Sequence, residues 1–354
     1  MLVRGKFRAK LSQFYKFNGL GSFGLIAKAS FSVVVIMAAV MDTGFASSPS
    51  MACEADWMGL KVNLFAFDFD GTCTQKDTTS LLYKASERYR SSTQAEMKII
   101  DERWIEIGTI YWKGLQETVS RSMALHTDPN SLPSFNERGL RSFLQEVNKY
   151  NMAMMKKVEA SEILKGISKE GIKEIAKEVK LSPGCLNVLN HINLPLHLIS
   201  VNWCQELIQA NLDHLRHVNI FANSFPLEGE LSSGHVGKKV TSPFDKETIF
   251  QDLVHKLSTD SSNGISVFVG DSIGDILAML KADVGIVVGK SHTLRKVAKA
   301  FGIKLLPLQE IQKMTGNGCQ EFATPKERGI LFEAPSWNEI GFTLFGTRYI
   351  PNKF

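Results

Sequence analysis

Two aspartates, one residue apart, end an apolar run early in the chain, where residues 65–74 read FAFDFDGTCT. A buried strand that stops at two carboxylates can present Asp68 as a nucleophile and Asp70 as a general acid and later base. This pair suits phosphoryl transfer, because one carboxylate can attack phosphorus while the other handles protons. Such chemistry also needs groups that neutralise the charge of the phosphate.

Further polar residues follow later apolar runs. Ser200 ends LHLIS, Lys246 lies in a helical segment, and Asp271 and Asp275 follow ISVFVG, on one helical face if that turn is helical. Ser200 can bind a phosphate oxygen, and Lys246 can neutralise the nucleophile and the phosphoryl group. Clustered carboxylates repel one another unless a cation lies among them, and a few hard oxygen ligands suit Mg²⁺. The predicted metal ligands are Asp68, Asp70, Asp271 and Asp275.

The segments that carry these residues alternate between strands and helices. Helical segments are expected after Cys185, Trp203 and Pro243 and over ILAMLKA, with a hairpin around residues 229–237. The predicted strands are residues 61–69, 196–201, 218–225, 265–270 and 284–289. This alternation predicts an α/β fold with a Rossmann-like core, in which helices cover both faces of a parallel sheet. Ligands bind such sheets at the carboxyl ends of the strands.

Residues 77–180 differ in character from the segments on either side. They are rich in helix formers with apolar spacing of 3.6 residues, interrupted by TDPNSLPS at 127–134. We expect an all-helical cap that closes over the site, excludes water and admits small substrates. The aromatic residues Trp104, Tyr111 and Trp112 are expected to pack within this cap. The predicted domains are a leader over 1–59, a core over 60–76 and 181–354, and the cap over 77–180.

The charge of the 354-residue chain is uneven. Six of its 41 basic residues and none of its 36 acidic residues lie in residues 1–41, so this segment carries +6 and leaves 35 basic against 36 acidic residues in the rest of the chain. A near-neutral body argues against a nucleic-acid surface. The basic, acid-free start is typical of an organellar transit peptide, with a secretory signal or anchor as the alternative. The apolar run 31–41 is too short for a comfortable membrane span, so no stable membrane insertion is expected. Five scattered cysteines predict neither a disulfide framework nor a zinc site.

Four of these features resemble the motifs of the haloacid dehalogenase (HAD) superfamily, in the same order. They are DFDGT at 68–72, the apolar run ending at Ser200, Lys246, and GDSIGD at 270–275. The resemblance implies an aspartyl-phosphate phosphatase, because the dehalogenases lack an aspartate at the position of Asp70. It also implies that the backbone carbonyl of Asp70 contacts the metal and that Thr72 hydrogen-bonds Asp70 or the phosphate. The insertion falls where this superfamily places its C1 cap.

A narrower resemblance covers residues 62–346. Segments such as LHLISVNWCQELIQA and VFVGDSIGDILAMLKADVGIVVG look like the phosphatase portion of the plant bifunctional thiamin-salvage family, without its thiaminase-II-like domain. That resemblance implies hydrolysis of thiamin monophosphate and a functional link to a separate thiaminase-II-like enzyme. Trp203, three residues past Ser200, is the candidate for stacking on a cationic substrate ring.

Several alternatives stay open at the level of sequence. The substrate is expected to be a small phosphate monoester, and a pyrimidine nucleotide or vitamin-B6 phosphate would fit the same residues. A non-catalytic binding protein that kept the fold is the alternative from another class. We expect a mitochondrial location, with the plastid as the alternative, and a start at Met41 or Met51 would give a cytosolic form.

Overall fold

A seven-stranded parallel sheet forms the centre of the protein, in the order β3-β2-β1-β6-β7-β9-β8. In this computed structural model the described residues are 59–127, 134–258, 264–314 and 328–351, so the predicted leader lies almost wholly outside them. The order reverses between β1 and β6, which is where parallel sheets bind ligands. The strands are β1 Val62–Phe67, β2 Leu196–Ile199, β3 Val218–Phe221, β6 Ile265–Gly270, β7 Val284–Val288, β8 Lys304–Pro307 and β9 Ile330–Ala334.

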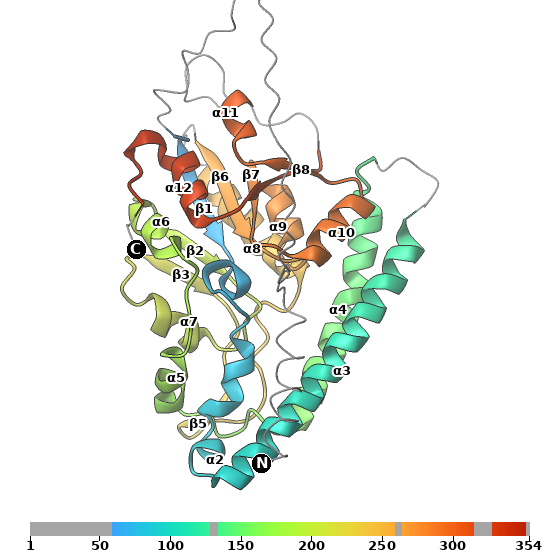
Figure 1. Ribbon diagram of the computed structural model, residues 1–354, viewed down its shortest axis with the longest axis vertical. Helices are drawn as coiled ribbons and strands as arrows, with labels where there is room; N and C mark the ends of the chain where they lie inside the picture. Colours follow the sequence, from blue (N-terminus) through green and yellow to red (C-terminus); the bar gives the residue numbers. More distant parts are fainter. Residues whose placement is uncertain (1–58, 128–133, 259–263, 315–327, 352–354) are drawn as a thin grey trace, which may run out of the picture. The chain divides into compact units, whose positions relative to one another are not determined.

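Helices cover both faces of this sheet (Figure 1). One face packs against α6 Cys185–His191, α7 Gln205–Leu212, α11 Glu310–Met314 and α12 Trp337–Phe345. The other face packs against α8 Pro243–Ser258, α9 Ile276–Lys281 and α10 His292–Ala300. The predicted α/β class with a Rossmann-like core is therefore confirmed.

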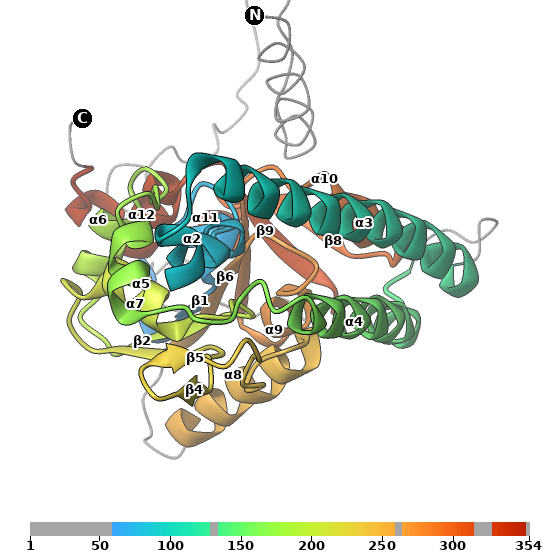
Figure 2. The ribbon, with the colours of Figure 1, turned by 90° about the horizontal axis from the view of Figure 1, so that it is seen from below.

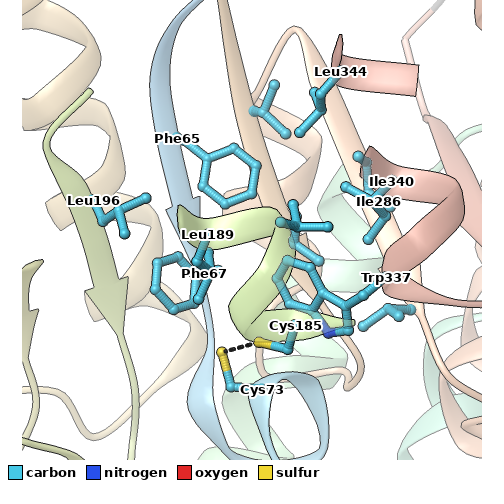
Figure 3. Close-up of a cluster of buried hydrophobic side chains, with 14 of the residues drawn as sticks. Phe65, Phe67, Cys73, Cys185, Leu189, Leu196, Ile286, Trp337, Ile340 and Leu344 are labelled. Carbon is cyan, nitrogen blue, oxygen red and sulfur yellow. Dashed lines mark hydrogen bonds between the residues drawn. The ribbon is translucent and has the colours of Figure 1, made fainter. Parts of the chain in front are cut away.

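The side chains of β1 explain why it lies at the centre. Phe65 and Phe67 point to the α6 and α12 face, while Leu64 and Ala66 point to the opposite face, and all four are buried. Such a strand reads as a continuous apolar run rather than as an alternating one. Figure 3 shows Phe65 and Phe67 in the hydrophobic cluster on the α6 and α12 face of the sheet.

Residues of the same hydrophobic cluster hold the loop that follows β1. Trp337 Nε1 donates to the carbonyl of Thr72 at 2.9 Å, and the thiols of Cys73 and Cys185 lie 3.2 Å apart, both as free cysteines (Figure 3). These buried contacts fix the backbone just after Asp68 and Asp70. The loop is therefore positioned by the core and not by its own turn alone.

Between residues 77 and 180 the named elements among the described residues are all helices, joined by turns and isolated β-bridges. They are η2 Thr79–Ala85, α2 Glu87–Arg90, α3 Gln94–His126, α4 Glu137–Ala160 and α5 Lys169–Ala176. Thr93 and Glu96 form a capping box that starts α3. The two ends of the insertion lie side by side, because the N–H of Gln75 donates to the carbonyl of Lys180 at 2.9 Å.

The long α3 and α4 helices lie side by side as a hairpin that is attached to the core at both ends (Figures 1 and 2). At one end Phe143 packs on Phe301 of the core, with ring centroids 5.4 Å apart, and Arg141 forms an ion pair with Glu247 of α8. At the other end Met155 and Val158 join a cluster with Leu207 of α7. Because both ends are docked, the hairpin is braced against the core rather than hinged freely.

Several elements differ from the sequence-based expectation. The strands β8 and β9 and the helices α10, α11 and α12 were not predicted, and the small hairpin of β4 Leu227–Glu228 and β5 Leu231–Ser232 begins before residue 229. Residues 271–274 form a turn, and α9 starts only after Asp275, so the turn is not helical and the condition under which Asp271 and Asp275 would share a helical face is not met. Within the described ranges, no helix combines the length and the apolar character that crossing a membrane requires.

Candidate active site

The carboxyl ends of three neighbouring strands meet at the candidate site. Asp68 follows β1, Ser200 follows β2 and Asp271 follows β6. Gly71 allows the close approach of the first and third ends, because it has a φ of +75° and a Cβ built there would lie 2.5 Å from Asp271 Oδ2. A side chain at this position would strain the backbone and displace that carboxylate.

Lys246, in the first turn of α8, joins the strand ends from the side. Its Nζ lies 2.8 Å from Asp68 Oδ1 and 2.6 Å from Asp275 Oδ1, and it is only 1% exposed. The other oxygen of Asp275 accepts from the N–H and hydroxyl of Ser272, at 3.0 and 2.9 Å. Asp275 is thus held on both oxygens and fixes the ammonium beside Asp68.

Three of the predicted metal ligands come together. Oxygen atoms of Asp68, Asp271 and Asp275 lie within 4.8 Å of one another. Burial raises the pKa of Asp68 to about 6 against the opposing charge of Lys246, and burial with the charges of Asp275 and Asp68 raises that of Asp271 well above its usual range. Three carboxylates that lie this close repel one another, and the single charge of Lys246 does not neutralise them all. Their hard oxygen atoms are suitable ligands for Mg²⁺. Both oxygens of Asp275 already accept from Lys246 or Ser272. The residues that would hold the metal are therefore Asp68 and Asp271.

Asp70 faces a different group of residues. Its Oδ1 accepts from the N–H and the hydroxyl of Thr78, both at 2.7 Å, and its Oδ2 accepts from Asn202 Nδ2 at 2.6 Å. Burial is the main cause that raises the pKa of Asp70 to about 7, with the Asp77 carboxylate adding to it. A carboxyl group that is partly protonated near neutral pH is suited to general acid and base catalysis.

The remaining predicted residues lie around these two groups. The Thr72 hydroxyl donates to Asp271 Oδ1 at 3.4 Å, whereas it is Thr78 that bonds Asp70. The buried Ser200 accepts from the N–H of Asn202 at 3.2 Å, which leaves its hydroxyl proton available for a phosphate oxygen. Trp203 is half-buried and packs against the cluster that joins the insertion to α7, rather than among the carboxylates.

Sequence reasoning did not single out Thr78 or Asn202 as site residues. Both are buried, at 3% and 1% exposure, and both contact Asp70. The sequence feature that could have indicated Asn202 is its position, two residues after Ser200 at the end of an apolar strand. Thr78 offered no comparable signal, because its contact depends on the path of the chain into the insertion.

Two curated relatives match most of the chain. It is 30% identical over 297 residues to the mitochondrial bifunctional TH2 protein of Arabidopsis thaliana, a match that covers 77% of this chain and 48% of that protein. It is 22% identical over 267 residues to a CTO1 family protein of Schizosaccharomyces pombe, which covers 70% of this chain and 89% of that protein. The chain thus spans about half the length of the TH2 protein. No protein-family model matches it.

Solved structures give weaker matches. A phosphoserine phosphatase with a phospho-aspartyl intermediate analogue has a TM-score of 0.40 and 18% identity, covering 72% of this chain and 98% of that one. Cytosolic 5'-nucleotidase IIIB bound to cytidine has a TM-score of 0.42 and 14% identity, covering 81% and 84%. The sequence match and the parallel core described above identify the chain as a homologue of the bifunctional TH2 protein over 77% of its length.

Proposed function

We propose that this chain is a magnesium-dependent phosphomonoesterase that works through an aspartyl phosphate on Asp68. The observation that carries the proposal is the division of the site into two groups. Asp68, Lys246, Asp271 and Asp275 form one charged cluster, while Asp70 lies apart from it, held by Thr78 and Asn202. A binding protein needs no such separation of a nucleophile from an acid and base.

In the first step, an Asp68 oxygen attacks phosphorus, and the bond from phosphorus to the ester oxygen breaks. The departing oxygen takes the proton of the Asp70 carboxyl group. Lys246 neutralises charge beside Asp68, and the Ser200 hydroxyl donates to a phosphate oxygen. When bound, Mg²⁺ supplies further neutralisation of the phosphate charge.

In the second step, the ionised Asp70 takes a proton from water, and the water oxygen attacks phosphorus. The bond between phosphorus and Asp68 breaks, which releases phosphate and restores the Asp68 carboxylate. Asp70 ends protonated and ready for the next ester. One carboxyl group therefore serves both steps, first as an acid and then as a base.

Thiamin monophosphate is the substrate that we propose. The homology to the TH2 protein supports it, and so does the chemistry beside Asp70. Asp77 directly precedes Thr78, which bonds Asp70, and the Asp77 carboxylate helps to raise the pKa of Asp70. A carboxylate at this place would favour a leaving group that carries a cationic ring.

Phosphate release by residues 59–354 with Mg²⁺ tests the function. Thiamin monophosphate would be compared with pyridoxal phosphate, a pyrimidine nucleotide and p-nitrophenyl phosphate, with Asp68→Asn as the inactive control. Selective hydrolysis of thiamin monophosphate is expected, and Asp77→Asn should raise its KM more than that of p-nitrophenyl phosphate. Hydrolysis of the other esters alone would remove thiamin from the proposal, and no hydrolysis at all would favour a binding protein.

We also propose the domain limits and the cellular setting. The helical segments of 77–180 and the contact of Gln75 with Lys180 support a cap inserted into a core of 60–76 and 181–354. The name of the TH2 relative and the basic segment 1–41 support a mitochondrial location, and a separate thiaminase-II-like enzyme is the proposed functional partner. Import of the full chain into isolated mitochondria, compared with a chain that begins at Gly59, tests the location.

A further inference from the structure

The carboxylate of Asp70 is enclosed by hydrogen-bond donors from two other segments of the chain. Thr78 lies just before η2 in the first turn of the insertion, and Asn202 lies in the loop after β2. Besides their bonds to Asp70, the two are joined to each other, because Asn202 Nδ2 lies 2.9 Å from the Thr78 hydroxyl oxygen. The three side chains form a closed triangle in which both amide protons and the hydroxyl proton are used.

Asn202 is itself fixed on every other side. Its Oδ1 accepts from the N–H of Cys204 at 2.9 Å, and its own N–H donates to Ser200 Oγ at 3.2 Å. Its carbonyl accepts from the N–H of Asn223 at 3.2 Å. Since the Cys204 N–H can only donate, the amide oxygen must face it and the amide nitrogen must face Asp70.

We propose that Asn202, together with Thr78, is a positioning residue that aligns Asp70 for both proton transfers. This inference rests on the phosphatase function proposed above. Asn202 acts through Asp70 and neither gives nor takes a proton in either step. The loop that contains Asn202 also contains Ser200. Asn202 therefore connects Asp70 to the phosphate-binding hydroxyl of Ser200 and, through Thr78, to the start of the insertion.

The role makes a prediction about leaving groups. An alkyl phosphate departs as a strong base and needs the proton of Asp70, whereas p-nitrophenolate departs without one. Loss of alignment should therefore slow the first step for thiamin monophosphate and spare it for p-nitrophenyl phosphate. The second step needs Asp70 as a base with either substrate, so it should slow for both.

The experiment compares wild type and Asn202→Ala with these two substrates and Mg²⁺ by steady-state and stopped-flow kinetics. We expect kcat for thiamin monophosphate to fall on the order of 10²-fold with little change in KM, as for loss of acid catalysis. With p-nitrophenyl phosphate we expect a burst of one nitrophenolate per enzyme, followed by slow turnover. An equal loss of the pre-steady-state rate for both substrates would overturn the inference and leave the proposed function standing. Wild-type protein inactive on both substrates would overturn both.

Asn187 on α6 provides a control with no bond to Asn202 among the described residues. It is half-buried, and its amide donates to the Tyr349 hydroxyl at 3.0 Å and to the carbonyl of Ile350 at 3.1 Å. Asn187→Ala should lower the unfolding temperature and leave the ratio of the rates of the two substrates unchanged. If Asn202→Ala does not fold, Thr78→Val removes the hydroxyl that joins Asn202 to Asp70, and it should give the same burst while Thr78→Ser restores wild-type kinetics. A Thr78→Val variant without the burst would count against the triangle.

Discussion

At the scale of single residues, the carboxylates of the site cost stability when no metal is bound. A carboxyl group whose pKa is raised in the folded state stabilises the fold below its unfolded pKa, and this contribution is lost as the pH rises through the folded pKa. The relevant values are about 6 for Asp68 and about 7 for Asp70, against 3.8 for an unperturbed aspartate. The affected window therefore runs from about pH 4 to about pH 7.

We predict that the metal-free protein loses on the order of several kcal/mol of unfolding free energy as the pH rises through this window, and that Mg²⁺ restores the part that comes from the cluster of Asp68 and Asp271. Asp271→Asn should raise the unfolding temperature of the metal-free protein at pH 7.5, abolish the response to Mg²⁺ and abolish activity. The exposed Asp252→Asn on α8 is the control, with no expected effect. Calorimetry at several pH values measures the unfolding temperature with and without Mg²⁺. A metal-free protein that is most stable at pH 7.5 would contradict the predicted loss of stability with rising pH.

Lys246 offers a second residue-scale prediction, because it is a buried cation between two buried carboxylates. Replacing it by methionine leaves Asp68 and Asp275 facing each other without compensation, which should cost about 3–5 kcal/mol. Adding Asp275→Asn removes one of the two charges and should recover part of that loss, although activity stays absent. Urea unfolding of both single variants and the double variant measures this coupling, and strictly additive losses would refute it.

At the scale of elements, the sequence predicted best those strands that are buried on both faces. The range of β6 was predicted as observed, and β1 and β7 within a residue or two at each end, because each is a short apolar run. The half-exposed β8 was missed, since KLLP carries no run of that kind. The position of β9 between β7 and β8 depends on how the chain crosses the sheet, which local patterns do not encode.

The residues of the candidate site also fall into those that the sequence could predict and those that it could not. Asp68, Ser200 and Asp271 could be predicted because each directly follows a strand, and parallel strands bring such residues to one edge. Thr78 and Asn202 could not, because an amide and a hydroxyl become significant only through the partners that folding gives them. The turn at 271–274 was also beyond reach, since Asp275 shapes it by accepting from the N–H of Ser272.

The docked α3–α4 hairpin leads to a prediction about its packing. Phe143 of α4 is fully buried against Phe301, so Phe143→Ala should cost about 3–5 kcal/mol. It should also release that end of the hairpin and make α3 and α4 sensitive to brief proteolysis. Ile99→Ala is the control on the same hairpin, because Ile99 is 66% exposed. Equal protease resistance of the two variants would show that this contact does not hold the hairpin.

At the scale of the whole molecule, residues 58–354 form one compact unit, so the site should function without the segment before it. The first described residues take part in this unit. The N–H of Leu60 donates to the carbonyl of Leu344 at 3.0 Å, and the carbonyl of Lys61 accepts from the N–H of Ile265 at 2.9 Å. Val62 begins the central strand β1, whose far end carries Asp68.

A chain that starts at Gly59 should therefore match the full chain in unfolding temperature and in phosphate release. A chain that starts at Leu64 loses these backbone bonds and the half-buried Leu60 and Val62, a cost of about 2 kcal/mol or more. Its unfolding temperature should fall by roughly 4–8 °C, with a parallel loss of activity because β1 positions the nucleophile. If the Gly59 start were itself inactive while the full chain hydrolysed phosphate esters, residues before it would have to contribute to the site.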